Sequence, residues 1–326
     1  MCRQAFLLVI LLFSVFGFSQ TKIIDSQTKH PVSYATISFG NGQGVFADDE
    51  GQFLFTEKIY PDVDSLFVSA LGFKDLNIST ENLPKILELQ PHIDQLDEIV
   101  VRAKLDRKYK EETIKAYLDD DYHKCWLPTI ESEIAVYFKN EDDKLKKLSE
   151  IHFPIALESV DWKKRHKSNA EKKPFSTLFK VNIYHNDNGR PGKPLSYQNI
   201  VFRATEKDGD QFTLDVSAFD IYIPDSGLFV SLQVLGYADN AGKLLPNKKY
   251  KEIKSGGALV KIPTNFRPLL PFTNEIPENN TFIKRVFLHG NQWIQFKKGH
   301  FTDSSLLNAG LTNYGMGLTF KVYKDE

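Results

Sequence analysis

Residues 45–55, VFADDEGQFLF, place three consecutive acids and a glycine between two apolar runs. Asp favours turns because its carboxylate bonds nearby backbone amides, and Gly favours them because it accepts a positive φ angle. The flanking residues are apolar, β-branched or aromatic, as is typical of strands. The stretch therefore predicts two strands that meet at an acidic corner. We expect the same alternation of short strands and turns throughout the N-terminal region.

The three acids, Asp48, Asp49 and Glu50, have a second interpretation as a calcium site. Ca²⁺ takes about six or more oxygen ligands, and the EF-hand pattern D-x-[DN]-x-[DN]-G is absent here. Neighbouring residues on a strand also point to opposite faces, so they do not aim at one ion. We therefore expect a turn, with a weak calcium site as the alternative.

Short strand-like runs surround the corner. They alternate with turn residues at intervals of roughly ten residues, and no amphipathic helix interrupts them. The runs are YATISFG (34–40), SLFVSALGF (65–73), KILELQP (85–91) and LDEIVVRA (96–103). This spacing predicts a small β-sandwich at residues 21–101.

The composition agrees with a mainly β protein of two domains. The chain has 326 residues, with 25 Phe and 13 Tyr but only 2 Met, and aromatic side chains suit half-buried strands. The formal net charge of −1 produces no long-range field that would attract nucleic acid. We therefore expect no nucleic-acid partner.

Residues 1–20, MCRQAFLLVILLFSVFGFSQ, have the features of a secretory signal peptide. A basic residue precedes an apolar run, Ala5–Phe18, that is shorter than the roughly 20 residues needed to span a bilayer. We expect cleavage near Ser19 or Gln20, with an uncleaved membrane anchor as the alternative. Cleavage leaves Cys125 without a second cysteine, and no later apolar run is long enough for a transmembrane helix.

A charged segment separates the N-terminal region from the rest. Residues 104–121, KLDRKYKEETIKAYLDDD, contain no Gly or Pro and only scattered apolar residues, which favours a helix on a domain surface. We predict a helical linker at residues 102–128. Beyond it, ten runs rich in aromatic and β-branched residues predict an antiparallel, jelly-roll-like sandwich over residues 129–326.

Three motifs of the N-terminal region resemble the carboxypeptidase-like regulatory domain. They are a strand with Pro31, Ala35 and Ile37, a hairpin with Asp48, Gly51 and Phe53 in which Ala47 replaces the usual Thr, and an apolar strand with Leu66, Val68, Gly72 and Phe73. The resemblance covers residues 23–73. It implies a seven-stranded, transthyretin-like sandwich.

The segment LDEIVV (96–101) resembles the sequence that follows this domain at the start of TonB-dependent outer-membrane receptors, where a plug and a barrel come next. A plug and a large barrel need several hundred residues, more than residues 102–326 supply, so we expect neither. Residues 181–236 look like the C-terminal part of secreted bacterial proteins that pair the regulatory domain with an uncharacterised sandwich. That resemblance implies no activity.

Motifs of familiar hydrolases and metal sites are missing. No histidine is followed by Glu three residues later, so neither H-x-x-E nor H-E-x-x-H zinc chemistry is expected. There is no G-x-S-x-G elbow and no phosphate-binding glycine loop. In HKCW (123–126), His123 and Cys125 are two potential metal ligands without a second pair. We assign no catalytic, metal or cofactor residue and expect no cofactor.

Aromatic side chains supply the candidate ligand site. Trp162, Tyr184, Trp293 and Tyr314 are the candidates for a stacking platform that binds sugar, although aromatic residues in strands more often belong to a core. The basic run DWKKRHK (161–167) includes Trp162 and is either a solvated loop or a contact for an acidic partner or glycan.

Together these patterns predict an exported, non-enzymatic binding or interaction protein of a Gram-negative cell envelope, located in the periplasm, at the outer membrane or outside the cell. Its expected partner is a protein or glycan of the envelope, and exposed edge strands offer one mode of recognition. One alternative is a carbohydrate-binding module of an outer-membrane uptake system. A second is a secreted hydrolase that uses one of His152, His185, His289 or His300 with a carboxylate and a nucleophile.

Overall fold

A computed structural model of the chain describes residues 20–92 and 107–324, except 143, 166, 168, 248–249, 263, 289, 291 and 302–303. The protein is mainly β, with 47% strand and 6% helix, which confirms the predicted fold class at this coarse level. The signal peptide predicted before Gln20 and the segment LDEIVV lie outside the described residues.

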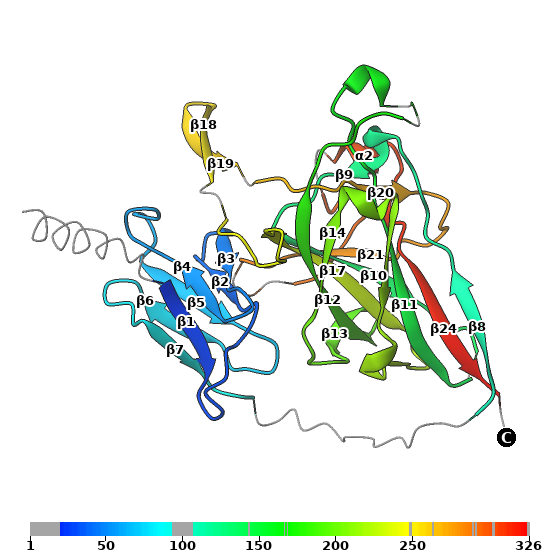
Figure 1. Cartoon of the computed structure of the whole chain (residues 1–326), viewed down its shortest axis with the longest axis horizontal. Coiled ribbons are helices and arrows are strands. Elements are labelled where there is room, and N and C mark those ends of the chain that lie inside the picture. Colours follow the sequence, from blue (N-terminus) through cyan, green and yellow to red (C-terminus); the bar gives the residue numbers. More distant parts are fainter. Residues whose placement is uncertain are drawn as a thin grey trace, which may run out of the picture.

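The first seven strands form two sheets, which together we call the N-terminal unit (Figure 1). The three-stranded sheet has the order β4 (Gln52–Leu54), β1 (Gln20–Asp25), β7 (Ile86–Leu89). The four-stranded sheet has the order β3 (Gly44–Phe46), β2 (Thr36–Ser38), β5 (Ser65–Ser69), β6 (Leu76–Ser79). Strand β1 pairs with β7 in parallel and with β4 antiparallel. The unit has its own core, in which Ile23, Ile37 and Leu66 are fully buried.

The acidic stretch is a corner between β3 and β4, which belong to different sheets. The Asp48 carboxylate is buried and accepts hydrogen bonds from the backbone amides of Glu50 (3.0 Å) and Gln52 (2.8 Å). Gly51 has a φ of +73°, and a Cβ there would lie 2.5 Å from the Ile23 carbonyl oxygen, so Gly is required. The Asp48 carboxylate and Gly51 therefore shape the chain reversal, which is the turn that the sequence predicts.

The C-terminal unit contains two large antiparallel sheets. The middle sheet consists of β10 (Ser132–Phe138), β12 (Ser176–Asp187), β13 (Arg190–Pro194), β14 (Ile200–Thr205), β17 (Leu228–Tyr237), β21 (Thr281–Arg285) and β22 (Ile294–Gln295). The outer sheet consists of β8 (Tyr109–Ile114), β11 (Lys146–Pro154), β15 (Gln211–Asp215), β16 (Tyr222–Ile223) and β24 (Gly317–Tyr323). One hydrophobic core includes residues of both sheets.

Smaller elements complete the unit. One sheet joins β9 (Cys125–Trp126), β20 (Leu270–Thr273) and β23 (Asn313–Tyr314), and a separate hairpin joins β18 (Lys251–Ser255) to β19 (Ala258–Ile262). The helical elements are α2 (Ser305–Asn308) and the 3-10 turns η2 (Tyr122–Lys124), η3 (Trp162–Lys164), η4 (Glu206–Asp208) and η5 (Ser217–Phe219). No helix of the described residues is long and apolar enough to cross a membrane.

The predicted helical linker is wrong where the structure describes it. Residues 109–114 form strand β8, which pairs antiparallel with β24 at the edge of the outer sheet. Its charged and polar residues are suited to an exposed edge strand, and the Thr113 and Thr319 hydroxyls lie 3.1 Å apart across the pair. Long-range pairing with the C-terminal strand therefore overrides the local helix propensity.

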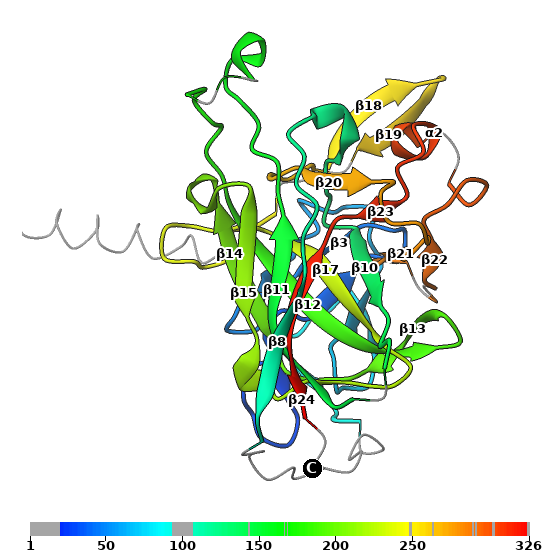
Figure 2. The ribbon, with the colours of Figure 1, turned by 90° about the vertical axis from the view of Figure 1, so that its right-hand side faces the viewer.

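The sheets are arranged in layers. From right to left in Figure 1 lie the outer sheet, the middle sheet and the N-terminal unit. Figure 2 shows the same order from front to back. Strands β10, β12 and β17 are buried along most of their length, on both faces, although antiparallel sheets commonly leave one face to solvent.

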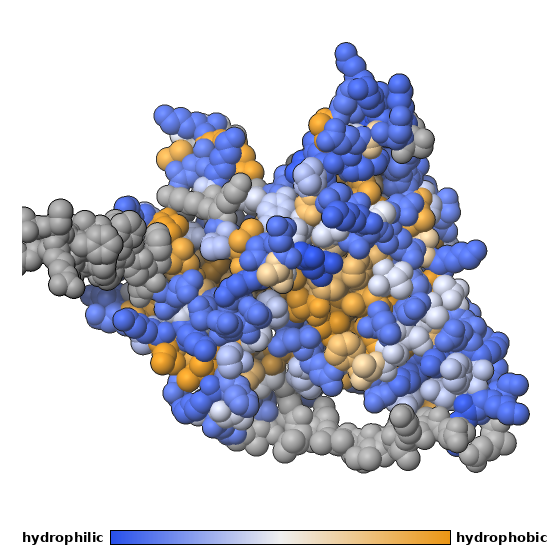
Figure 3. Space-filling view, viewed as in Figure 1, coloured by the Kyte–Doolittle hydropathy of each residue, from blue (hydrophilic) through white to orange (hydrophobic). Residues whose placement is uncertain are grey.

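Apolar side chains reach the surface on one side of the C-terminal unit (Figure 3). Strands β14 and β15 follow one another in sequence but belong to different sheets. Figure 3 shows apolar atoms at the surface near β12 and β14. Val201 and Phe212, on β14 and β15, are partly buried side chains that pack against the core.

The N-terminal unit contacts the C-terminal unit through β2 and β3. The Ser38 hydroxyl donates to the Phe287 carbonyl (2.6 Å), and the Gly44 amide donates to the Tyr250 hydroxyl (3.1 Å). The Phe46 and Phe287 rings lie 5.2 Å apart, and both side chains belong to the core of the C-terminal unit. An apolar contact, these hydrogen bonds and an ion pair between Lys243 Nζ and the Asp48 carboxylate (3.6 Å) thus join the two units.

Replacing the corner carboxylate tests the role of the acidic stretch. Asp48→Ala leaves the amides of Glu50 and Gln52 without their acceptor and should lower the free energy of unfolding by about 1–3 kcal/mol. Asp49→Asn, a change at an exposed neighbour, is the control and should stay within about 0.5 kcal/mol of the wild type. Urea unfolding measures both, and equal effects would show that the acids are interchangeable.

Removing one interface ring tests the contact between the units. Phe287 is fully buried, so Phe287→Ala should destabilise the protein by about 3–5 kcal/mol through lost contacts and a cavity. Leu288→Ala, at the exposed neighbour, should cost less than about 1 kcal/mol. Calorimetric unfolding of the full chain gives the comparison. A Phe287→Ala protein as stable as Leu288→Ala would contradict the packing described here.

Candidate functional site

The middle sheet presents a polar face to the N-terminal unit. On β12, Phe179, Val181 and Ile183 belong to the core between the sheets, so Lys180 and Asn182 point to the opposite face. The strand register places four polar residues side by side across β12, β17, β10 and β21, in the order Lys180, Gln233, Glu133, Lys284. A row of charged and amide side chains therefore crosses a buried surface.

Glu133 is the centre of this row. One carboxylate oxygen accepts hydrogen bonds from Asn182 Nδ2 (2.8 Å), the Tyr184 hydroxyl (2.8 Å) and the Ser231 hydroxyl (2.6 Å). The other lies 3.0 Å from Lys284 Nζ. Burial acts to raise the pKa of Glu133, but the charge of Lys284 and the three hydrogen bonds outweigh it and hold the pKa below its usual value. Glu133 is therefore ionised.

Lys180 is a buried cation without such compensation. Its side chain is buried, and it forms no ion pair or hydrogen bond with the residues that the structure describes. Burial lowers the pKa of Lys180 to about 8; the charge of Glu133 acts to raise it, and that of Lys284 lowers it further. The ammonium form is thus costly in this structure.

A cavity of about 600 Å³ lies between the polar row and the N-terminal unit. The middle sheet contributes Lys180, Asn182 and Gln233 to its lining, and the N-terminal unit contributes residues of β2, β5 and β6. The volume is in the usual range of small-molecule sites. The middle sheet and the N-terminal unit therefore line opposite sides of a partly open cavity, and the polar row is part of that lining.

The predicted aromatic platform is only partly assembled. Tyr184 and Trp293 contact each other edge to face, with ring centroids 5.6 Å apart. Lys284 Nζ lies 4.9 Å from the Trp293 ring and 5.8 Å from the Tyr184 ring. Tyr184 lines the cavity between the two units. Its own burial, together with the charge of Glu133, raises the pKa of the Tyr184 hydroxyl well above the usual value, so the hydroxyl remains a hydrogen-bond donor. These two predicted residues thus meet beside Glu133.

The other two predicted residues lie elsewhere. Tyr314 is fully buried and donates its hydroxyl hydrogen to the Pro154 carbonyl (3.0 Å), so the prediction that it binds a ligand is wrong. Trp162 is 48% exposed and contacts Tyr122, with Arg165 stacked over its ring at 4.2 Å. The four aromatic residues therefore do not form one platform, because Tyr314 is buried in the core of the C-terminal unit and Trp162 packs against Tyr122 instead.

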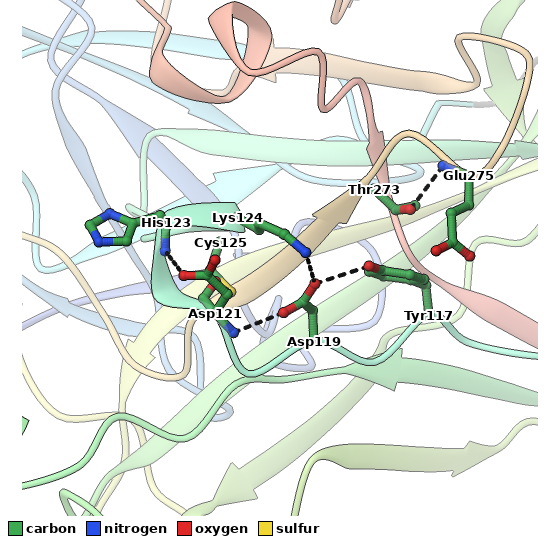
Figure 4. Close-up of polar contacts among 8 residues, drawn as sticks. All are labelled: Tyr117, Asp119, Asp121, His123, Lys124, Cys125, Thr273 and Glu275. Atoms are coloured by element: carbon green, nitrogen blue, oxygen red, sulfur yellow. Dashed lines mark hydrogen bonds and ion pairs between the residues drawn. The ribbon is translucent and has the colours of Figure 1, made fainter. Parts of the chain in front are cut away.

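Cys125 lies in surroundings that disfavour a thiolate. Burial, reinforced by the carboxylates of residues 119–121, raises the pKa of the Cys125 thiol to about 12. Its Sγ donates to the Asp121 carbonyl (3.3 Å). Figure 4 shows the His123 imidazole directed away from the thiol. That ring instead lies edge to face with Trp162, with the two ring centroids 6.2 Å apart. His123 and Cys125 are not paired as nucleophile and base.

The acids beside Cys125 are engaged in local hydrogen bonds. Asp119 accepts from the Tyr117 hydroxyl (2.9 Å) and pairs with Lys124 (2.8 Å), as Figure 4 shows. In the part of the chain that the structure describes, no third potential ligand joins His123 and Cys125 to form a metal cluster. Asp119 is therefore bound by residues close to it in the chain.

The histidines of the hydrolase alternative do not converge. His152 lies between the hydroxyls of Thr319 (2.7 Å) and Thr213 (3.2 Å), and Glu150 is 3.8 Å from the same nitrogen that contacts Thr319. A triad instead places the carboxylate on the other nitrogen. His185 and His300 are exposed, and His289 lies outside the described residues.

Sequence reasoning did not select Glu133, Lys180 or Lys284. A signal was present, because each is a charged residue inside a strand of otherwise mostly apolar residues, in SEIAVYF, STLFKVNIYH and TFIKRVFLH. In a sheet with one solvated face such residues are simply the exposed set. Only the third layer turns them into a buried row.

The chain has a weak structural likeness to a bacterial surface protein. That structure contains the cysteine protease and lectin-like domains of Cwp84, a surface layer associated protein of Clostridium difficile. The two chains are 12% identical with a TM-score of 0.29, and the match covers 59% of this chain and 32% of that chain. No protein-family model matches this chain, and no curated protein matches it.

The prediction that this protein is not an enzyme is contradicted, because the structural neighbour contains a cysteine protease domain. That expectation is not kept. At a TM-score of 0.29 the likeness carries neither protease nor lectin function to this chain.

Glu133 should make a contribution to stability that acid removes. Its pKa is lower in the folded than in the unfolded protein, so the contribution is complete above the usual Glu pKa of about 4.3 and is lost as pH falls through the folded value. Glu133→Gln should therefore be less stable than the wild type by about 3–5 kcal/mol at neutral pH, with a gap that narrows towards pH 3.

Urea unfolding between pH 7 and pH 3 measures this gap. Glu81→Gln, a change at an exposed carboxylate, is the matched control and should differ little from the wild type at any pH. A gap for Glu133→Gln that stays constant or widens on acidification would refute the assignment of an ionised Glu133.

Proposed function

We propose that this chain is an exported envelope protein that binds a ligand in the cavity between its two units. The observation that carries the proposal is the buried polar row of the middle sheet, which lines that cavity together with the N-terminal unit. A contact that only joined two units would be served by apolar residues, which often replace buried ion pairs without loss of stability. Polar groups that line a partly open cavity instead suit recognition of a ligand.

Membership of the carboxypeptidase-like regulatory domain family is part of the proposal for the N-terminal unit. Its support is the set of three sequence motifs and the seven strands divided between a three-stranded and a four-stranded sheet. For the C-terminal unit we propose a jelly-roll-like sandwich, supported by its two large antiparallel sheets around one core.

Export to a Gram-negative envelope rests on the apolar run of residues 1–20. A tagged chain expressed in a Gram-negative host should appear in envelope fractions or medium with its N-terminus near residue 20, as read by mass spectrometry. The comparison is a chain in which Leu11 and Leu12 are changed to Arg, which interrupts the apolar run and should remain in the cytosol. An intact leader on a cytosolic wild-type product would refute export.

A carbohydrate-binding module is the second candidate function. Its support is the Tyr184–Trp293 pair beside Lys284, because sugar rings pack on aromatic faces and their hydroxyls bond amides and charged groups. The partner is then an envelope glycan rather than an envelope protein.

Filling the cavity tests the proposed function. Ala70 lines it on the N-terminal side, so Ala70→Phe should reduce the binding of envelope glycans on an array at least about tenfold, whereas Lys207→Ala, on the exposed turn η4, should bind as the wild type does. Thermal unfolding must show that both variants fold. Equal binding by wild type and a folded Ala70→Phe protein would place recognition outside the cavity.

A further inference from the structure

We propose that the cavity between the two units binds an acidic sugar and that Lys180 pairs with the carboxylate of that sugar. This inference rests on the proposed function, because it takes the cavity as the ligand site. It adds the charge and chemical class of the ligand, which the polar row itself does not specify.

The charges of the row leave one cation without a partner. Glu133 Oε2 lies 3.0 Å from Lys284 Nζ, so that pair neutralises itself. Lys180 is only 7% exposed and makes no ion pair with a described carboxylate. Buried charges in proteins are almost always paired, because an isolated charge loses its hydration without compensation. Asp75 also lines the cavity, but it is exposed and makes no ion pair with Lys180 among the described residues, so one further anion would complete the buried row.

The position of Lys180 makes the missing partner a ligand. Lys180 lines the cavity of about 600 Å³. It also lines a second cavity of about 310 Å³, whose lining includes Asp25 and His30 of the N-terminal unit. Lys180 therefore lines open space on two sides, and Asn182 and Gln233 line the first of these cavities with it.

The rest of the lining favours a sugar over a bare inorganic anion. Asn77 and Asn182 approach from opposite units, and amide side chains both donate and accept, as sugar hydroxyls do. Phe67 and Tyr34 add aromatic surface on the N-terminal side. The cavity is also far larger than an inorganic anion requires, since a water molecule occupies only about 30 Å³.

The proposal makes binding depend on pH. With a pKa of about 8 in the free protein, Lys180 is largely charged at pH 7 and largely neutral at pH 10, so affinity should fall as pH rises through this range. Other titratable groups face the same spaces. They are Glu133, Lys284 and Tyr184 on the sheet, and Asp25, His30, Tyr34 and Asp75 on the N-terminal unit.

The test is calorimetric titration of the full mature chain with trigalacturonate, neutral galactotriose and inorganic phosphate. We expect trigalacturonate to bind best, with affinity at least about tenfold lower in Lys180→Met and about tenfold lower in the wild type at pH 10 than at pH 7. Lys180→Arg should retain binding at pH 10, because Arg stays charged. The control Lys207→Met should match the wild type.

Several results would overturn the inference. They are equal binding of galactotriose, equal binding of phosphate, undiminished binding by a folded Lys180→Met protein, or a pH dependence that persists in Lys180→Arg. A neutral sugar that Ala70→Phe excludes but Lys180→Met still binds would overturn the acidic-sugar inference alone and leave the cavity as the ligand site. Binding that Ala70→Phe leaves unchanged would refute the proposed function instead.

Discussion

The ionised carboxylate of Glu133, buried between two β layers, sets the main constraint on this structure. Taking a carboxylate out of water costs several kcal/mol unless donors replace the lost hydration. Here Asn182, Tyr184, Ser231 and Lys284 supply them from three other strands of the same sheet. The carboxylate thereby links β10, β12, β17 and β21, and the N-terminal unit lies across the cavity that Glu133 lines.

The middle sheet consequently has two unlike faces. One face packs against the outer sheet in an apolar core, where residues such as Leu148, Val230 and Leu318 are fully buried. The other face is polar near Glu133 and Lys180, while the contact with the N-terminal unit is apolar around Phe46 and Phe287. The apolar contact supplies the attachment, so the polar part is free to serve recognition.

Local features of the fold were predictable from the sequence because short-range chemistry decides them. The run SEIAVYF forms strand β10 over its whole length, and the Asp48 corner follows from turn residues alone. The residues around Tyr109 were not predictable in this way. Their composition favours a helix, and only pairing with β24, two hundred residues later in the chain, makes them a strand.

The candidate site was harder to predict than the strands. Tyr184 and Trp293, which do meet, were candidates for the ligand site because they are aromatic. The buried Tyr314 was a candidate for the same reason, because the sequence does not say on which face of a strand an aromatic ring is buried. Glu133 and Lys180 look like ordinary solvent-facing residues of a two-layer sandwich. Their burial depends on a third layer from a separate part of the chain, and no local pattern records that contact.

The most direct test of this account measures whether the N-terminal unit holds one position on the middle sheet. Spin labels at exposed Glu81 and Asp225, one in each unit, in a background without Cys2 and Cys125, allow the separation to be measured by double electron–electron resonance. The account predicts one narrow distance distribution for the wild type. A broad or multi-peaked distribution would mean that the units are not docked, and it would contradict the burial of Glu133 and Lys180.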